Sequence, residues 1–332
     1  MGIKTKIDWC DSTCNPAMGC DGCELSGGHC YAEQLCKRHA GQAGWPKKFS
    51  RPELVSAEKR MAEALAWPDL TGKDRADKPW LNGMPRLVFL CDLADPFSES
   101  ISADARTHWL TRASGEMLAS RHVWLLLTKR PHIMRRYVRW WCEQHCENWP
   151  ENIWLGTSVT RADTAWRIAE LLQIHAAVRF VSLEPLLGPL DLDRLPAPEG
   201  CGPCLHYSAL REHADDNSYY LPPTLLDWVI AGGESGASAR PSHPDWFRGL
   251  RDQCAAAGVP FFFKQWGEYR PTGYPSLGRG QRCLRADGRE QWTPSPDCTI
   301  MARAGKTANG WHLDGRAHHD MPKLHEMKDG ED

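Results

Sequence analysis

The sequence predicts an α/β fold, built as a full or partial (β/α) barrel of the TIM type. Short apolar runs alternate with helical stretches along most of the chain. Runs that stay apolar at every position are typical of parallel strands covered on both faces, and repeated strand–helix alternation indicates βαβ units. The alternative is an open doubly wound sheet. No G-x-G-x-x-G follows an early strand, which makes a dinucleotide-binding domain of that kind the weaker choice.

The apolar runs predict strands within residues 86–97, 123–131, 153–160, 178–188, 228–236 and 260–269. Helices are expected at 102–120, where Ser102 can cap the first turn, and then from 131 through 146, at 162–175 and at 244–257. We therefore expect a barrel over residues 1–269. It contains an insertion at 189–223, rich in Pro, Gly, Asp and His, and is followed by an irregular C-terminal extension at 270–332.

Composition limits the class of protein. The 332 residues include 40 Lys and Arg and 42 Asp and Glu, so the net charge of −2 excludes a strongly basic protein of the histone type. No run of eighteen apolar residues is present, so we expect no membrane partner. The first residues have no apolar signal segment, which predicts a cytoplasmic protein. In that compartment the 14 cysteines are expected to bind metal or do chemistry rather than form stable disulfides.

Polar residues follow each predicted strand at the same end. In a barrel these ends form the face that carries catalytic groups. Helix caps and turns account for some of the polar residues, but a lysine directly after an apolar run is costly to bury unpaired. We therefore expect Lys129, Glu184 and Lys264 to be catalytic. The other polar residues at these ends are Asp92, Asp95, Ser158 and the triplet Gly232, Gly233 and Glu234.

Three cysteines lie close together near the N-terminus. Cys20 and Cys23 form a C-x2-C pair, and Cys30 follows after six residues in a glycine-rich loop. Thiolates are ligands for zinc or iron–sulfur clusters. A structural zinc site needs four ligands, and the fourth would come from Cys14, His29 or Cys36. A 4Fe–4S cluster held by three cysteines instead leaves one iron open to a substrate or cofactor.

The chain resembles a phage- and prophage-encoded family of largely unassigned function that is grouped with the radical SAM superfamily. The matching segments include NPAMGC, CYAE, LLLTKRP and DWVIAGGESG, and they extend in order over residues 15–20, 30–33, 125–131, 152–159, 178–192, 227–236, 239–269 and 304–316. The resemblance implies a TIM-like barrel of the radical SAM type with a loop-borne 4Fe–4S cluster. It also implies that Cys20, Cys23 and Cys30 bind the cluster, and that S-adenosyl-L-methionine is the cofactor.

In such enzymes an external one-electron reductant supplies the electron that splits S-adenosylmethionine, and the 5′-deoxyadenosyl radical abstracts a hydrogen from the substrate. The phage context of the relatives suggests a DNA substrate, such as a hypermodified thymine, or a nucleotide. One candidate reaction is the radical isomerisation of an aminoacyl-thymine. The alternatives are radical repair or modification of another nucleic acid or of a protein, and a zinc-stabilised nucleic-acid-binding protein without catalysis.

Two features depart from the superfamily pattern. The usual cysteine spacing is C-x3-C-x2-C, whereas this chain has C-x2-C-x6-C, which leaves Cys23 the least certain ligand. The superfamily's Gly-Gly-Glu triplet follows the second strand and binds the amino group of S-adenosylmethionine. Here Gly232, Gly233 and Glu234 follow a late strand. We therefore expect Asp92 or Asp95 to take the amino group and the triplet to line the ribose or the substrate, unless it forms only a tight turn.

Two further segments carry weaker signals. Cys201 and Cys204 form a C-x2-C pair in the insertion, close to His206 and His213, and this set is compatible with zinc, an auxiliary cluster or an unliganded loop. Arginines among aromatic residues at 130–141 either contact phosphates or form the solvated face of a barrel helix.

Overall fold

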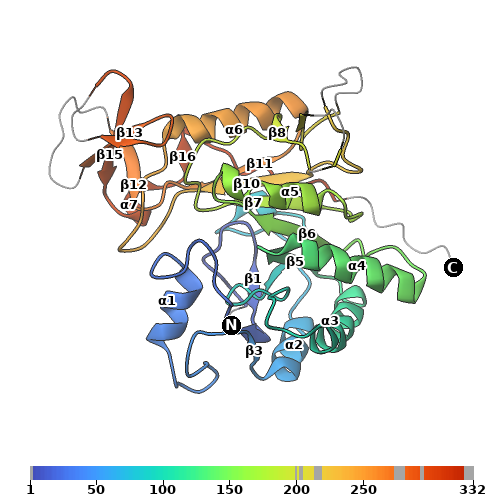
Figure 1. Cartoon of the computed structure of the whole chain (residues 1–332). Helices are drawn as coiled ribbons and strands as arrows, with labels where there is room; N and C mark the ends of the chain where they lie inside the picture. Colours follow the sequence, from blue (N-terminus) through green and yellow to red (C-terminus); the bar gives the residue numbers. More distant parts are fainter. Residues whose placement is uncertain are drawn as a thin grey trace.

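The computed structural model describes residues 3–198, 200–201, 205–212, 219–272, 281–291 and 295–324. Its centre is a seven-stranded, all-parallel sheet that curls into a partial barrel (Figure 1). This is the α/β architecture that the sequence predicts. In spatial order the strands are β1 (Ser12–Cys14), β4 (Leu87–Leu90), β5 (Val123–Thr128), β6 (Ile153–Ser158), β7 (Arg179–Leu183), β10 (Trp228–Gly232) and β11 (Phe261–Gln265).

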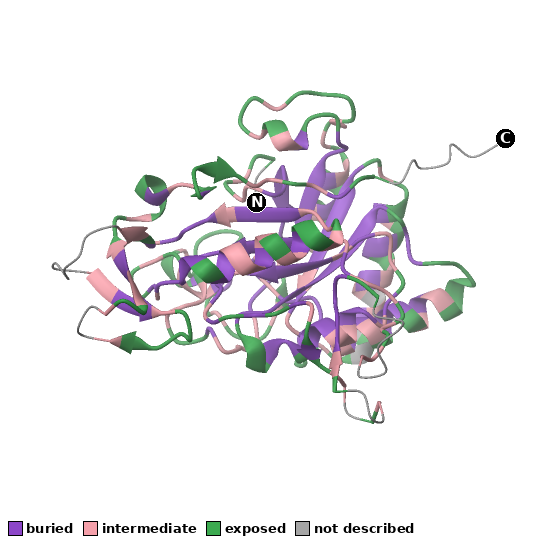
Figure 2. Cartoon of the chain, turned by 90° about the horizontal axis from the view of Figure 1, so that it is seen from above, coloured by how far each residue is buried: buried purple, intermediate pink, exposed green. Residues whose placement is uncertain are grey.

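Helices cover the outer face of the sheet. They are α2 (Ala57–Leu65), α3 (Ala103–Leu118), α4 (Pro131–His145), α5 (Trp166–Leu171) and α6 (Pro244–Ala257), with α1 (Tyr31–Arg38) beside the N-terminal strands. The strands are buried, while the helices are buried on one side and exposed on the other (Figure 2). Within the described residues, no helix is long and apolar enough to cross a membrane.

Aromatic side chains fill the concave face of the sheet. Successive residues of β4 alternate between two apolar clusters, with Leu87 and Phe89 on the inner side and Val88 and Leu90 on the side of the helices. The inner cluster contains Trp9, Trp154, Phe180, Trp228 and Phe262. The core of the barrel is therefore filled with side chains.

Segments outside the sheet close the gap between the edge strands β1 and β11. The short helix η1 (Pro79–Leu81) places the ring of Trp80 4.1 Å from His319 and 6.0 Å from Phe262 of β11. The indole N–H of Trp80 donates to the carbonyl of Asp8, just before β1. Lys78 donates to the carbonyls of three residues in the same N-terminal segment, Thr5, Ile7 and Cys10. Residues from both ends of the chain thus complete the wall of the barrel.

Short strands flank the central sheet. Two-stranded pairs are β2 (Ala17–Met18) with β3 (Glu53–Leu54), β8 (Leu195–Pro196) with β9 (His206–Tyr207), and β16 (His312–Leu313) with β17 (Arg316–Ala317). Further short helices are η2 (Ala162–Thr164) and α7 (Lys306–Asn309). In the predicted insertion, Cys201 and His206 are described, whereas Cys204 and His213 lie outside the described residues.

The C-terminal extension contains an antiparallel sheet where the sequence predicts irregular structure. Its order is β12 (Tyr269–Thr272), β15 (Cys298–Arg303), β13 (Gln281–Arg285) and β14 (Glu290–Gln291). These strands are short and separated by Gly and Pro, so the sequence shows no readable period. Their pairing is set by contacts across the hairpins rather than by local pattern.

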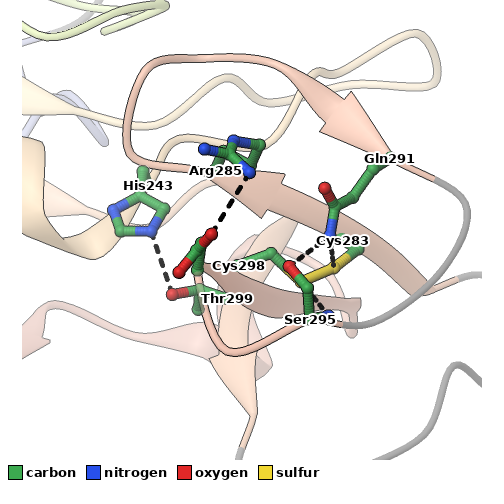
Figure 3. Close-up of a disulfide and its surroundings, with 8 residues drawn as sticks. His243, Cys283, Arg285, Gln291, Ser295, Cys298 and Thr299 are labelled. Atoms are coloured by element: carbon green, nitrogen blue, oxygen red, sulfur yellow. Dashed lines mark hydrogen bonds and ion pairs between the residues drawn. A yellow bond between two sulfur atoms is a disulfide. The ribbon is translucent and has the colours of Figure 1, made fainter.

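A disulfide joins Cys283 of β13 to Cys298 of β15 (Figure 3). This differs from the expectation of no stable disulfide. Antiparallel pairing brings the two Cα atoms to 5.8 Å, inside the range that a disulfide spans, and composition alone does not reveal such proximity. Thr299 and His243 are hydrogen bonded at 2.9 Å, which ties the hairpin to the first turn of α6.

We predict that Gly156→Ala destabilises the fold. A Cβ atom at Gly156 would lie 2.5 Å from the ring of Phe180, which is fully buried between strands. Overpacking of this kind typically costs about 1–3 kcal/mol. Gly115→Ala is the control, because a Cβ there meets nothing within 4 Å and an exposed helical alanine stabilises by roughly 0.5–1 kcal/mol. Urea unfolding would measure both, and equal stability of the two variants would contradict the packing argument.

Candidate functional site

A cavity of about 400 Å³ lies over the carboxyl ends of the parallel strands. All the predicted site residues except Gly232 line it: Cys20, Cys23, Cys30, Asp92, Asp95, Lys129, Ser158, Glu184, Gly233, Glu234 and Lys264. The carboxyl ends of parallel strands meet at one edge of a sheet, which explains why residues so far apart in sequence share one cavity. Gly232 is the last residue of β10 and is buried just beneath.

The three cysteines belong to a loop at residues 19–30, between β2 and α1, which we call the cysteine loop. Arg130, at the end of β5, holds its first half. The guanidinium donates to the carbonyl of Gly22 at 2.8 Å and lies 3.9 Å from Cys20 Sγ. The same guanidinium donates to Asp95 Oδ2 at 3.0 Å, and both side chains are about nine-tenths buried. The loop is therefore tied to the ends of β4 and β5.

Two more ion pairs hold the second half of the cysteine loop. Glu24 forms a two-pronged pair with Arg167 of α5, at 2.9 and 3.0 Å. Burial raises the pKa of Glu24, but the hydrogen bonds and charge of Arg167 outweigh it and lower the pKa to about 2. His29 is hydrogen bonded to Glu234 at 3.1 Å, after β10. The loop thus spans the strand ends from β4 to β10.

Asp95 and Glu234 are already engaged by protein groups. Asp95 accepts from Arg130, from the hydroxyl of Thr128 and from the backbone N–H of Lys129. Glu234 accepts three hydrogen bonds from Arg240, at 2.7 to 2.8 Å. Both carboxylates are therefore paired with arginines and orient protein groups. Neither offers an unpaired negative charge to a ligand.

The glycines of the triplet allow a close backbone approach. A Cβ atom at Gly233 would lie 1.9 Å from the carbonyl oxygen of Trp266, so no other residue fits there without a backbone shift. At Gly232 the nearest atom would be Cδ of Glu184, at 3.4 Å. The close backbone approach therefore requires glycine at Gly233, whereas Gly232 has room for a Cβ atom.

Glu184 and Lys264 form an ion pair across the cavity wall. The Lys264 ammonium donates to both carboxylate oxygens at 2.8 Å, and both side chains are at least four-fifths buried. Glu184 follows β7 and Lys264 is on β11, with β10 between them. Gln265 approaches the same carboxylate at 3.4 Å. The pair can hold a polar ligand group in a fixed place.

Asp92 lies in an apolar setting at the end of β4. Burial raises the pKa of its carboxyl to about 6, against partial opposition from the hydrogen bond donated by Asn15. The hydroxyl of Tyr31, next to Cys30, donates to the Asp92 carbonyl. Near neutral pH this carboxyl can therefore change its protonation state, which makes it the most adaptable acidic group in the cavity.

The three cysteines of the cysteine loop are partly buried. Burial raises the pKa of Cys20 and of Cys23, and the nearby cations oppose this, Arg130 at Cys20 and Lys129 at Cys23. In the part of the chain that the structure describes, no three or more His, Cys, Asp or Glu side chains are grouped to hold one metal ion. Of the predicted fourth zinc ligands, His29 lines the cavity, whereas Cys14 and Cys36 are buried outside its lining.

Some residues that line the cavity were not among the predicted site residues. Trp9 and Phe89 form its apolar floor, and Lys6 and Lys306 lie at its rim. Cys91 lines it from the end of β4, buried and with a left-handed backbone at φ 62°. Neither lysine follows a strand of the parallel sheet, so the sequence gives no indication that it lies at the cavity. Their place in the cavity lining is seen only in the folded structure.

We predict that Asp92→Asn stabilises the protein at high pH. A carboxyl whose pKa rises from 3.8 to about 6 on folding favours the folded state below pH 3.8, and this advantage is lost as the pH rises through 6. The shift corresponds to about 3 kcal/mol. Relative to wild type, the unfolding free energy of Asp92→Asn should therefore increase between pH 4 and pH 8. Urea titrations at both pH values would measure it, and a pH-independent difference would contradict the assignment.

We also predict that Arg167→Met loosens the cysteine loop. Removing one partner of a mostly buried pair leaves the Glu24 charge uncompensated. Amide hydrogen exchange at residues 20–30 should accelerate by about tenfold or more. The matched control is Arg139→Met, because the Arg139–Glu143 pair is mostly exposed and should contribute little. Unchanged exchange in Arg167→Met would show that the loop is held by other contacts.

Comparison with known proteins gives one match. Neither a curated protein nor a solved structure matches the chain significantly. A family model described as a protein of unknown function, DUF5131, matches residues 4–322, which include the cysteine loop, all seven strands of the central sheet and the C-terminal extension. The chain therefore belongs to the DUF5131 family of proteins of unknown function.

Proposed function

We propose that the protein is a radical SAM enzyme in which Cys20, Cys23 and Cys30 hold a 4Fe–4S cluster. One observation carries this proposal: the three cysteines of a single short loop line the same cavity as the polar strand ends of a partial barrel. A loop whose only task is structural has no need of a cavity beside it. The position at the carboxyl ends of the strands is where enzymes with this type of sheet carry their chemistry.

The donor set fits such a cluster. Thiolates are the ligands of iron–sulfur clusters, and the Arg130 guanidinium lies 3.9 Å from Cys20 Sγ, where it can balance part of their negative charge. In a cubane cluster each thiolate binds its own iron, so the three sulfurs do not need to converge on one point, as the ligands of a single ion must. Three cysteine ligands also leave one iron open. When bound, the cluster would supply the electron that cleaves S-adenosylmethionine to methionine and the 5′-deoxyadenosyl radical.

The chain's own residues would bind the cofactor and exclude water. Trp9, Phe89 and Leu127 give the cavity an apolar floor. Above it, Asp92 and Ser158 are the polar groups that we assign to S-adenosylmethionine, because Asp95 and Glu234 are engaged by arginines. Asp95 would act through Arg130, and Glu234 through His29, to position the cysteine loop.

The substrate side of the cavity is assigned to Lys129, Glu184 and Lys264. The Glu184–Lys264 pair is fixed by two short hydrogen bonds and can hold a polar group of the substrate. The proposed reaction requires an external one-electron reductant, and the substrate that we propose is a nucleotide or a modified base in DNA. Isomerisation remains the reaction that we propose.

The proposal predicts cluster-dependent cleavage of S-adenosylmethionine. Protein purified without oxygen and reconstituted with iron and sulfide should bind about four irons per chain. With dithionite and S-adenosylmethionine it should form 5′-deoxyadenosine. Cys20→Ala, Cys23→Ala and Cys30→Ala should each lose the cluster absorbance and the nucleoside, whereas Cys146→Ala, an exposed cysteine outside the cavity, should keep both.

A colourless protein that binds about one zinc per chain and forms no nucleoside would overturn the proposal. That outcome would favour the alternative of a zinc-stabilised protein that binds nucleic acid. Loss of iron in Cys20→Ala and Cys30→Ala but not in Cys23→Ala would contradict the assignment of Cys23 as the middle ligand.

A further inference from the structure

The acidic and basic groups of the cavity differ in how they are engaged. Each acidic side chain that lines the cavity accepts a hydrogen bond from a protein side chain: Asp92 from Asn15, Asp95 from Arg130, Glu184 from Lys264 and Glu234 from Arg240. The protein has thus already satisfied the acceptors. A ligand that only donates hydrogen bonds would find few free partners on this wall.

Donors on the same wall are left over. The ammonium groups of Lys6, Lys129 and Lys306 have no hydrogen-bond or ion-pair partner among the described residues, and all three lysines line the cavity. Trp9 is only 2% exposed, yet its indole N–H has no acceptor among these residues. Three unpaired ammonium groups in the lining of one cavity favour a ligand that accepts hydrogen bonds.

Local charge balance separates two of these lysines from the rest. Lys129 faces the cysteine loop, where it acts on the pKa of Cys23. Lys264 is paired with Glu184, and Lys78 donates to three backbone carbonyls. Asp8 is within electrostatic range of Lys264, Lys306 and Lys78. Lys6 and Lys306 have neither a hydrogen bond nor an ion pair among the described residues, and we call them the lysine pair.

The lysine pair lies within electrostatic range of Lys264. Partial desolvation, and then the Lys264 ammonium, lower the pKa of Lys306, and Lys6 acts in the same direction. Like charges gathered at one side of a cavity repel each other unless an anion lies between them. The cavity lining carries five cationic side chains against four acidic ones, and this excess of positive charge favours an anionic group such as a phosphate.

We propose that the lysine pair, with Lys264 beside it, binds a phosphate group of the substrate. This deepens the proposed function, since the claim that the phosphate belongs to the substrate of a radical enzyme rests on that function. Phosphate oxygens accept from several ammonium groups at once, and Lys binds phosphate as a point charge. Lys264 is on the edge strand β11, and Lys6 lies in the segment before the opposite edge strand β1.

Phosphate binding can be tested without a cluster. The probe is inorganic phosphate at pH 8, compared with sodium chloride and sodium acetate at equal ionic strength. Phosphate at about ten times its dissociation constant should raise the melting temperature of the full chain by about 2–4 °C. The double variant Lys6→Ala/Lys306→Ala should lose this rise. Lys47→Ala/Lys48→Ala removes the same charge from exposed lysines outside the cavity lining and should keep it.

The result is decided by these comparisons. An equal rise in both double variants, or an equal rise with acetate, would overturn the proposal. On cluster-loaded protein, loss of the phosphate response on adding S-adenosylmethionine would assign the lysine pair to that cofactor and also overturn it. Phosphate binding that disappears only in Lys6→Ala/Lys306→Ala, in a protein that forms no 5′-deoxyadenosine, would refute the proposed function and leave the phosphate site standing.

Discussion

The buried guanidinium of Arg130 joins the cysteine loop to the sheet, and the shape of the cavity depends on it. It contacts the loop at Cys20 and Gly22 and the sheet at Asp95. Asp95 is fixed in turn by Thr128 and by the backbone of Lys129, so strands β4 and β5 and the loop form one connected unit. A buried charge left without its partner costs about 3–5 kcal/mol. The loop and the strand ends therefore hold each other in place, and the cavity between them has a defined form.

Sequence reasoning was effective where the physics is local. The β5, β6 and β10 strands each begin with an apolar run, and all three are interior strands of the parallel sheet that this pattern predicts. The same pattern indicated that the polar residues after the strands share one edge of the sheet, because the carboxyl ends of parallel strands all lie at that edge. The first strand, β1, was not predicted, because it is only three residues long and two of these, Ser12 and Thr13, are polar. It exists through its pairing with β4 rather than through its own pattern.

Contacts between distant residues could not be predicted in the same way. Nothing near Glu24 indicates that its partner is Arg167, and nothing near Glu234 indicates that His29 is one of its partners. Their positions after the strands and the superfamily pattern suggested that Asp95 and Glu234 bind a cofactor, and the folded chain engages both with arginines. The sequence did not indicate Lys6 and Lys306 as site residues, because neither belongs to a predicted strand or helix. They reach the cavity only because the two ends of the chain meet there.

The anchors of the cysteine loop are spread along the chain in a way that affects folding during synthesis. Gly22 is 108 residues from Arg130, Glu24 is 143 residues from Arg167, and His29 is 205 residues from Glu234. At typical elongation rates the ribosome needs about 10–40 s to produce the last of these anchors after the loop itself. Contacts so far apart also form slowly, because a long segment must close before they can stabilise the fold. The nascent chain thus carries three accessible thiols for this interval, during which oxidation can damage the loop and metal delivery can reach it before the barrel closes around it.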